Sequence, residues 1–133
     1  MIGILILAHE PVAGSFGKAI SHVLGNVPAQ LAWLDVANNA HPPTVVNDAR
    51  QRIAQLNSGD GVLVCSDVCG ATPCNIATQL SQPGQVNVLS GLNLAMLLRA
   101  INYRNLSLDE LTEKALSGAK AGVMRMESDN AAN

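Results

Sequence analysis

The chain has 133 residues, which is enough for one domain with a hydrophobic core of its own. Its formal net charge is −2, and it holds one Trp, one Tyr and one Phe, so composition argues against a nucleic-acid surface and a base-stacking platform. It lacks an apolar run of the ~18 residues that a membrane-spanning helix needs and the basic start of a signal peptide. We therefore expect a soluble cytoplasmic protein with no stable membrane insertion.

The first third of the sequence alternates strand and helix patterns. The β-branched apolar run Ile2–Ala8 predicts a buried parallel strand that ends directly before His9. A helix is expected at about 15–24, because Gly25 is a typical residue after a helix C-terminus. A second strand is expected at 30–36.

The next elements continue this alternation. Asn38-Asn39 and Pro42-Pro43 mark a loop, after which Thr44 is expected to cap a helix over 45–56. A second apolar run predicts a strand over Val62–Ser66, which ends directly before Asp67.

A turn and a helix follow this strand. Thr72 is expected to cap the helix, because Pro73 would then take the first helical position, where its missing N–H costs nothing. That helix is expected to reach about Leu80. A strand over 86–89 and a helix over 94–103 come next.

The C-terminal part is expected to hold one more helix. Ser107 and Glu110 have the spacing of a capping box for a helix over 108–122. Residues 123–126 are short and apolar enough for an extra edge strand. The polar segment 127–133 is expected to be a disordered tail, which leaves 1–126 as a single domain.

Alternating strands and helices predict an α/β fold, a three-layer sandwich with helices on both faces of a parallel sheet. With so few strands we expect the order 2-1-3-4, in which the first and third strands are neighbours. Ligands bind where the strand order reverses, at the carboxyl ends of such neighbours. His9 and Asp67 occupy those two ends and are therefore expected to meet.

A paired imidazole and carboxylate can perform nucleophilic chemistry. Asp67 can hold the proton on one ring nitrogen of His9 and leave the other nitrogen free to attack. Gly70, Ala71 and Thr72 lead into a helix whose amino end favours an anion. The sequence thus predicts phosphorylation of His9. Nucleotide-binding glycine motifs and the clustered carboxylates of a magnesium site are missing, so another phosphoprotein is the expected donor, and neither cofactor nor metal is expected.

Three cysteines lie close together in the sequence, at Cys65, Cys69 and Cys74. Their spacing is not that of zinc ribbons or C-x-x-C redox motifs, and the simplest interpretation is small apolar filler. An Arg is missing from this stretch, which excludes a cysteine-phosphatase loop. A Cys/His metal or redox sensor stays open as an alternative function.

The segments ILILAHE, GVLVCSDVCGATPCNIA and VNVLSGLNLAML resemble the mannose-type enzyme IIA domains of the bacterial phosphoenolpyruvate-dependent sugar phosphotransferase system. The resemblance reaches to about Gly122. Its most specific parts are the His after the first strand and the pattern Asp-x-x-Gly-[GA]-[ST]-Pro-x-Asn that begins at Asp67. The stretch Gly91-Leu92-Asn93 is a third matching element.

The resemblance implies that the protein is a phosphocarrier, which as an enzyme is classed as a phosphotransferase. It implies that His9 accepts a phosphoryl group from HPr and passes it to an enzyme IIB, that Asp67 orients His9, and that Thr72 lies at the phosphate. Because a IIB domain is missing from this sequence, a separate IIB chain or a regulatory target is the expected acceptor. It also implies a strand-exchanged homodimer, in which Val123–Met126 would pair with the sheet of a second subunit.

Two residues depart from the family pattern: Glu10 replaces the usual Gly, and Ala71 replaces the second Gly of a pair. The charge of Glu10 leaves open a non-catalytic binding module of the same fold. The sequence identifies no sugar and leaves both transport and regulation open. Trp33 is expected in the core, and Val12 and Phe16 in either the core or an apolar docking patch. Arg99 and Arg104 are expected on solvated helix faces or in contact with an acidic partner. No catalytic role is expected for His22 and His41.

Overall fold

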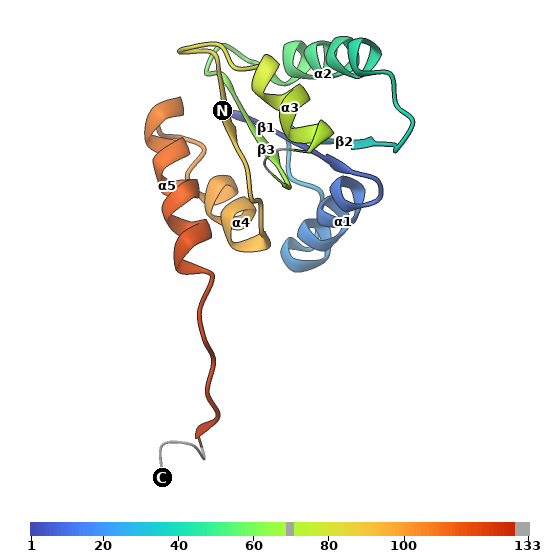
Figure 1. Cartoon of the computed structure of the whole chain (residues 1–133). Coiled ribbons are helices and arrows are strands. Elements are labelled where there is room, and N and C mark those ends of the chain that lie inside the picture. Colours follow the sequence, from blue (N-terminus) through green and yellow to red (C-terminus); the bar gives the residue numbers. More distant parts are fainter. Residues whose placement is uncertain (69–70, 130–133) are drawn as a thin grey trace.

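The computed structural model describes residues 1–68 and 71–129. Strands and helices alternate along most of the chain (Figure 1). In chain order the elements are β1 (Gly3–His9), α1 (Val12–Leu24), β2 (Leu31–Val36), α2 (Pro42–Leu56), β3 (Val62–Ser66), α3 (Thr72–Gln79), β4 (Val86–Leu89), α4 (Leu94–Asn102) and α5 (Leu108–Ala121).

The strands form a parallel sheet in the order β2-β1-β3-β4. Helices α2 and α3 cover one face of it, and α1, α4 and α5 cover the other (Figure 1). The predicted three-layer α/β sandwich and strand order are confirmed. The two central strands, β1 and β3, are buried on both faces, which explains why their sequences are apolar at nearly every position.

The two faces of β1 contribute side chains to two separate hydrophobic cores. Ile4, Ile6 and Ala8 pack with the residues of α1, α4 and α5, while Leu5 and Leu7 pack with those of α2 and α3. Because side chains alternate along a strand, His9 continues the row of Leu5 and Leu7. Its imidazole therefore belongs to the α2/α3 side of the sheet.

Three helices begin at other residues than the sequence predicts. α1 starts at Val12, three residues earlier. α2 starts at Pro42 rather than after a Thr44 cap, because proline suits the first helical turn, where no N–H partner is needed. In α3, Thr72 is the first helical residue and Ala71 precedes it as N-cap, so the prediction that Thr72 caps this helix is wrong.

The last two helices have side-chain caps. The Ser107 Oγ accepts a hydrogen bond from the Glu110 N–H at 3.3 Å, which is the serine half of the predicted capping box. Asn93 caps α4, since its Oδ1 accepts from the Met96 N–H at 2.8 Å. After α5 the chain runs away from the body of the protein (Figure 1), and residues 123–128 form no strand within this single chain.

Two side chains differ from their expected surroundings. Trp33 is only partly buried, and its ring packs on α1 at Gly17, where an added Cβ would lie 2.3 Å from the ring. Arg104 is 8% exposed and donates a hydrogen bond to the Ala29 carbonyl, so the expectation of a solvated helix-face arginine is wrong. Burial lowers the pKa of Arg104.

Candidate functional site

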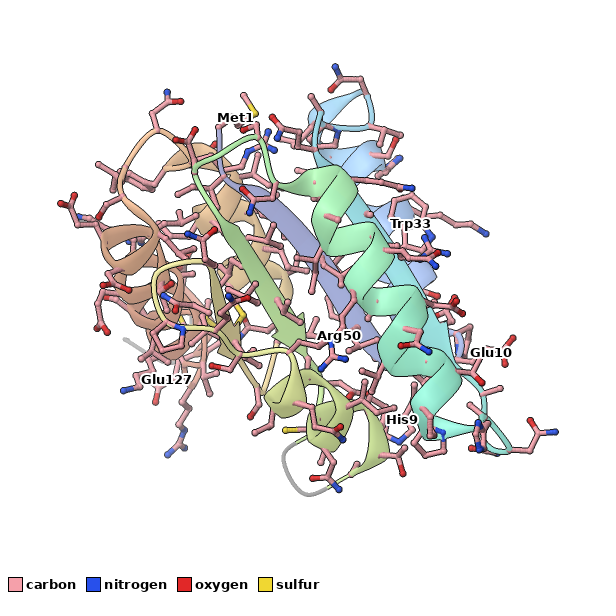
Figure 2. All side chains as sticks on the ribbon, turned by 90° about the horizontal axis from the view of Figure 1, so that it is seen from above. Met1, His9, Glu10, Trp33, Arg50 and Glu127 are labelled. Atoms are coloured by element: carbon pink, nitrogen blue, oxygen red, sulfur yellow. The ribbon has the colours of Figure 1, made fainter. Side chains whose placement is uncertain are left out.

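His9 and Asp67 meet at the carboxyl ends of β1 and β3. The His9 Nδ1 lies 2.6 Å from the Asp67 Oδ2, and the same carboxylate oxygen accepts the His9 backbone N–H at 3.1 Å. The His9 side chain is 40% exposed, whereas that of Asp67 is 13% exposed. In Figure 2, His9 lies at the end of the sheet opposite Met1, beside the amino end of α2. The structure thus brings together the two residues predicted from separate strands.

Asp67 is suited to hold a proton on His9. Partial burial tends to raise the pKa of Asp67, but hydrogen bonds from the His9 side chain and backbone outweigh burial and lower it below 3.8. The carboxylate is therefore ionised at neutral pH and accepts a hydrogen bond at Nδ1. With the proton on Nδ1, the Nε2 of His9 carries the free lone pair.

The stretch Gly91-Leu92-Asn93 holds the end of β3 in place. The Gly91 N–H donates to the Asp67 carbonyl at 2.7 Å, and the Leu92 N–H donates to the Ser66 carbonyl at 3.0 Å. Gly91 has a φ of 75°, which favours glycine. This stretch acts on the site through the backbone of Asp67.

The amino end of α3 follows Asp67 in the sequence. Ala71 is its N-cap residue and Thr72 its exposed first residue. No acidic side chain lies in the first turn of α3, and its N-cap makes no side-chain hydrogen bond. Gly70, which is predicted to contact phosphate, and Cys69 lie outside the described residues.

The segment after His9 is attached to β2, which the sequence analysis did not anticipate. The Glu10 N–H donates to the Val36 carbonyl at 3.0 Å, and the Gly14 N–H donates to the Asp35 Oδ1 at 3.1 Å. Pro11, the N-cap of α1, makes no side-chain cap bond, so Asp35 caps α1 from the neighbouring strand. The available signal was an Asp at the end of a strand, the same signal that identified Asp67.

The exposed side of α1 carries an apolar groove of about 330 Å³. Val12 and Phe16 line it and also pack against the core, so the core interpretation is confirmed, while the apolar docking patch stays a prediction. The groove begins two residues after His9 in the chain. Its lining residues are Pro11, Val12, Ser15, Phe16 and Ala19.

The cysteines give little support to a metal or redox site. Cys65 and Cys74 are buried free thiols, and burial raises the pKa of the Cys65 thiol to about 12, which disfavours the thiolate that binds metal. Among the residues that the structure describes, no group of His, Cys, Asp and Glu is arranged to hold a metal ion.

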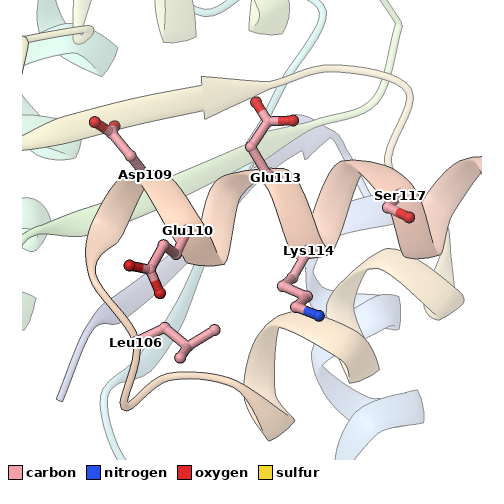
Figure 3. A pocket seen from close by; sticks show the side chains of 6 residues that line it. All are labelled: Leu106, Asp109, Glu110, Glu113, Lys114 and Ser117. Atoms are coloured by element: carbon pink, nitrogen blue, oxygen red, sulfur yellow. The ribbon is translucent and has the colours of Figure 1, made fainter.

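Two other histidines and a surface hollow are further polar features of the described residues. His22 and His41 are exposed, and within the described residues the His41 ring has one hydrogen-bond partner, the Thr44 hydroxyl at 3.1 Å. A hollow of about 650 Å³ lies along α5 (Figure 3). None of the predicted site residues lines it; its walls are Leu106, Asp109, Glu110, Glu113, Lys114 and Ser117.

Comparison with known proteins agrees with this geometry. The family model described as "PTS system fructose IIA component" matches residues 3–116. The mannose-specific EIIAB component of Escherichia coli (strain K12) is 26% identical over 130 residues, which cover 96% of this chain and 40% of that protein. The transcriptional regulatory protein LevR of Bacillus subtilis is 24% identical over 111 residues, or 80% of this chain and 12% of LevR.

A solved structure shares the fold. The crystal structure of the phosphotransferase system component EIIA from Streptococcus agalactiae has a TM-score of 0.84 and 24% identity, covering 94% of this chain and 97% of that one. The present chain spans 40% of the length of the E. coli relative and a smaller share of LevR. Within the described residues, every helix is too short or too polar to cross a membrane.

Proposed function

The chain belongs to the family of phosphotransferase-system IIA components, and from this membership we propose that it is a phosphocarrier that accepts a phosphoryl group on His9 from HPr. The 2.6 Å contact between the His9 Nδ1 and the Asp67 Oδ2 is the observation that carries the proposal. It supplies an oriented imidazole with one blocked and one open nitrogen, at an exposed position where another protein can reach it.

The proposed step is a transfer between two proteins. The His9 Nε2 lone pair forms a new N–P bond while the bond between phosphorus and the donor side chain breaks, and the donor recovers that electron pair. The proton on Nδ1 stays in place. Asp67 stabilises the positive charge that develops on the ring, as the carboxylate of a catalytic triad does.

We propose that the amino end of α3 receives the phosphoryl oxygens. Ala71 and Thr72 are the N-cap and the first residue of this helix, which begins five residues after Asp67 in the chain, and Gly70 precedes them in the sequence. Helix amino ends favour anions, and the first turn of α3 contains no carboxylate that would compete with phosphate. The Thr72 hydroxyl adds a donor for one oxygen.

The next acceptor is an enzyme IIB on a separate chain or a regulatory target. Similarity to an EIIAB component favours the first, and similarity to part of LevR favours the second. We place the protein in the cytoplasm, where HPr would meet it. Residues 1–126 form the functional domain of the proposal, with 127–133 as a tail.

The test is phosphorylation by purified enzyme I, HPr and phosphoenolpyruvate. The wild type should acquire an acid-labile phosphoryl group, and His9→Ala should acquire none, while His22→Ala and His41→Ala serve as matched controls that label normally. Label that persists in His9→Ala would disprove the assignment of His9. A wild type that stays unlabelled would favour the non-catalytic binding module.

We further propose that the protein is a homodimer through its C-terminal segment. Val123, Met124 and Met126 are 77%, 63% and 76% exposed in the single chain, an unusual state for apolar side chains so close together. β2 and β4 are the open edges of the sheet, and a strand from a second subunit would cover one of them.

Light scattering tests this assembly. The full chain should have the mass of a dimer, and a chain that ends at Gly122 should be a monomer. A monomeric full chain would refute the dimer, and a dimeric truncated chain would remove Val123–Met126 from its explanation.

A further inference from the structure

Asp35 lies beside the site without touching the imidazole. It is in register with Ala8, one residue before His9, and it caps α1 through the Gly14 N–H. Trp33 and Asp35 share one face of β2, the face that packs on α1 at Gly17 and Gly14. His9 points to the other face of the sheet, with Leu5 and Leu7. Any effect of Asp35 on phosphotransfer must therefore pass through the chain between Glu10 and Gly14.

β2 holds the chain from Glu10 to Gly17 at three successive points. The Val36 carbonyl accepts the Glu10 N–H, Asp35 accepts the Gly14 N–H, and the Trp33 ring covers Gly17. Of these three contacts, the one made by Asp35 is a hydrogen bond that its side chain accepts. Its fit depends on Gly14, because a Cβ at that position would lie 2.9 Å from the Asp35 Oδ2.

The held segment adjoins the phosphorylated residue. Consecutive Cα atoms are ~3.8 Å apart, so the Cα of Pro11 is within about 8 Å of that of His9. Even a small transient protein complex buries a few hundred Å² on each partner, which is a patch wider than this distance. A protein that delivers a phosphoryl group to His9 therefore covers Glu10 and Pro11, which are both exposed, and the start of the α1 groove.

We infer that Asp35 is a positioning residue for the partner rather than for the reacting imidazole. By capping α1 from β2, it keeps the segment from Glu10 to Phe16 in the arrangement that the phosphorylated partner contacts. This inference rests on the proposed function, since it assumes transfer from a phosphoprotein to His9. It predicts that loss of the cap raises KM for the donor protein and leaves kcat nearly unchanged.

The experiment measures transfer from phospho-HPr at varied donor concentrations. Asp35→Ala should raise KM about tenfold with kcat within about twofold of wild type. Asp35→Asn keeps an oxygen that can accept the Gly14 N–H, so it should restore KM to within about twofold. Ser107→Ala, which removes the cap of the distant helix α5, is the matched control and should leave both constants unchanged.

A second variant perturbs the same contact without removing the carboxylate. Gly14→Ala introduces the Cβ that displaces Asp35, so it should also raise KM, and the double variant with Asp35→Ala should be no worse than Asp35→Ala alone. If Asp35→Ala folds poorly, the single variant Gly14→Ala decides the matter, because an unchanged KM in folded Gly14→Ala would overturn the inference.

Three outcomes would overturn the inference: an unchanged KM in folded Asp35→Ala, a fall in kcat alone, or Asp35→Asn as impaired as Asp35→Ala. Wild type that is phosphorylated normally in the same assay separates these outcomes from failure of the proposed function, in which wild type itself would accept no phosphate.

Discussion

Two aspartates flank the strand that carries His9, one at the end of each neighbouring strand. One contacts His9 itself, and the other contacts the helix that follows it. Asp67, on the β3 side, contacts the His9 ring and backbone N–H. Asp35, on the β2 side, accepts a hydrogen bond from the backbone of α1 and lies, like Trp33, close to Gly14. In our proposals, the same residue type at equivalent ends of strands orients the reacting group on one side and the adjoining surface on the other. Strand-end position alone therefore does not assign a role to a carboxylate.

Of the variants that distinguish the β3 side from the β2 side, Asp67→Asn is expected to have the largest effect on phosphotransfer. An Asn can still bond to the His9 Nδ1, but it carries no charge to stabilise the developing imidazolium and can favour the wrong tautomer. We expect kcat for phosphotransfer to fall by roughly 10²-fold, in the range typical of lost acid–base assistance, with little change in KM. Phosphotransfer assays that are quenched at successive times, at phospho-HPr concentrations up to saturation, measure kcat and KM. A normal kcat in a folded variant would reduce Asp67 to a structural residue.

Gly17→Ala sharpens the comparison by altering the β2 side without touching either aspartate. The new Cβ would lie 2.3 Å from the Trp33 ring, so the helix or the ring must move. We expect a loss of about 1–3 kcal/mol in the free energy of unfolding, as in other overpacked sites. Urea denaturation checks this. Gly25→Ala is a contrasting variant, because Gly25 has open space around it and a φ of 81°, so any loss of stability there comes from backbone strain and not from crowding. A Gly17→Ala protein of wild-type stability would show that Trp33 is not tightly held.

The smallest expected effect is the dependence of stability on pH. The folded pKa of Asp67 lies below 3.8, its ordinary value, so the stability it contributes is present above that pH and is lost as pH falls through the folded pKa. Asp67→Asn should lack this part of the acid destabilisation. Denaturation curves of both proteins between pH 3 and pH 7 compare them. Identical pH profiles would mean that Asp67 gains no stability from its contact with His9.

Much of this arrangement could be predicted from the sequence, because β1 and β3 are apolar on both faces and leave little doubt about their ends. The pairing of His9 with Asp67 follows from strand order alone. The contact of Asp35 with α1 could not be predicted, since it depends on a helix that starts at Val12 and on the closeness of Gly14 to β2. Arg104 also required the structure, because its burial against the Ala29 carbonyl depends on how distant loops meet.

The central claim is that Asp67 blocks one ring nitrogen of His9 and leaves the other to accept phosphate. The most direct measurement is the nitrogen–hydrogen correlation spectrum of ¹⁵N-histidine-labelled protein before and after incubation with enzyme I, HPr and phosphoenolpyruvate. We predict that phosphorylation changes the Nε2 resonance of His9 to that of a phosphorylated nitrogen, while Nδ1 stays protonated. A phosphoryl group on the His9 Nδ1, or on His22 or His41, would contradict the account.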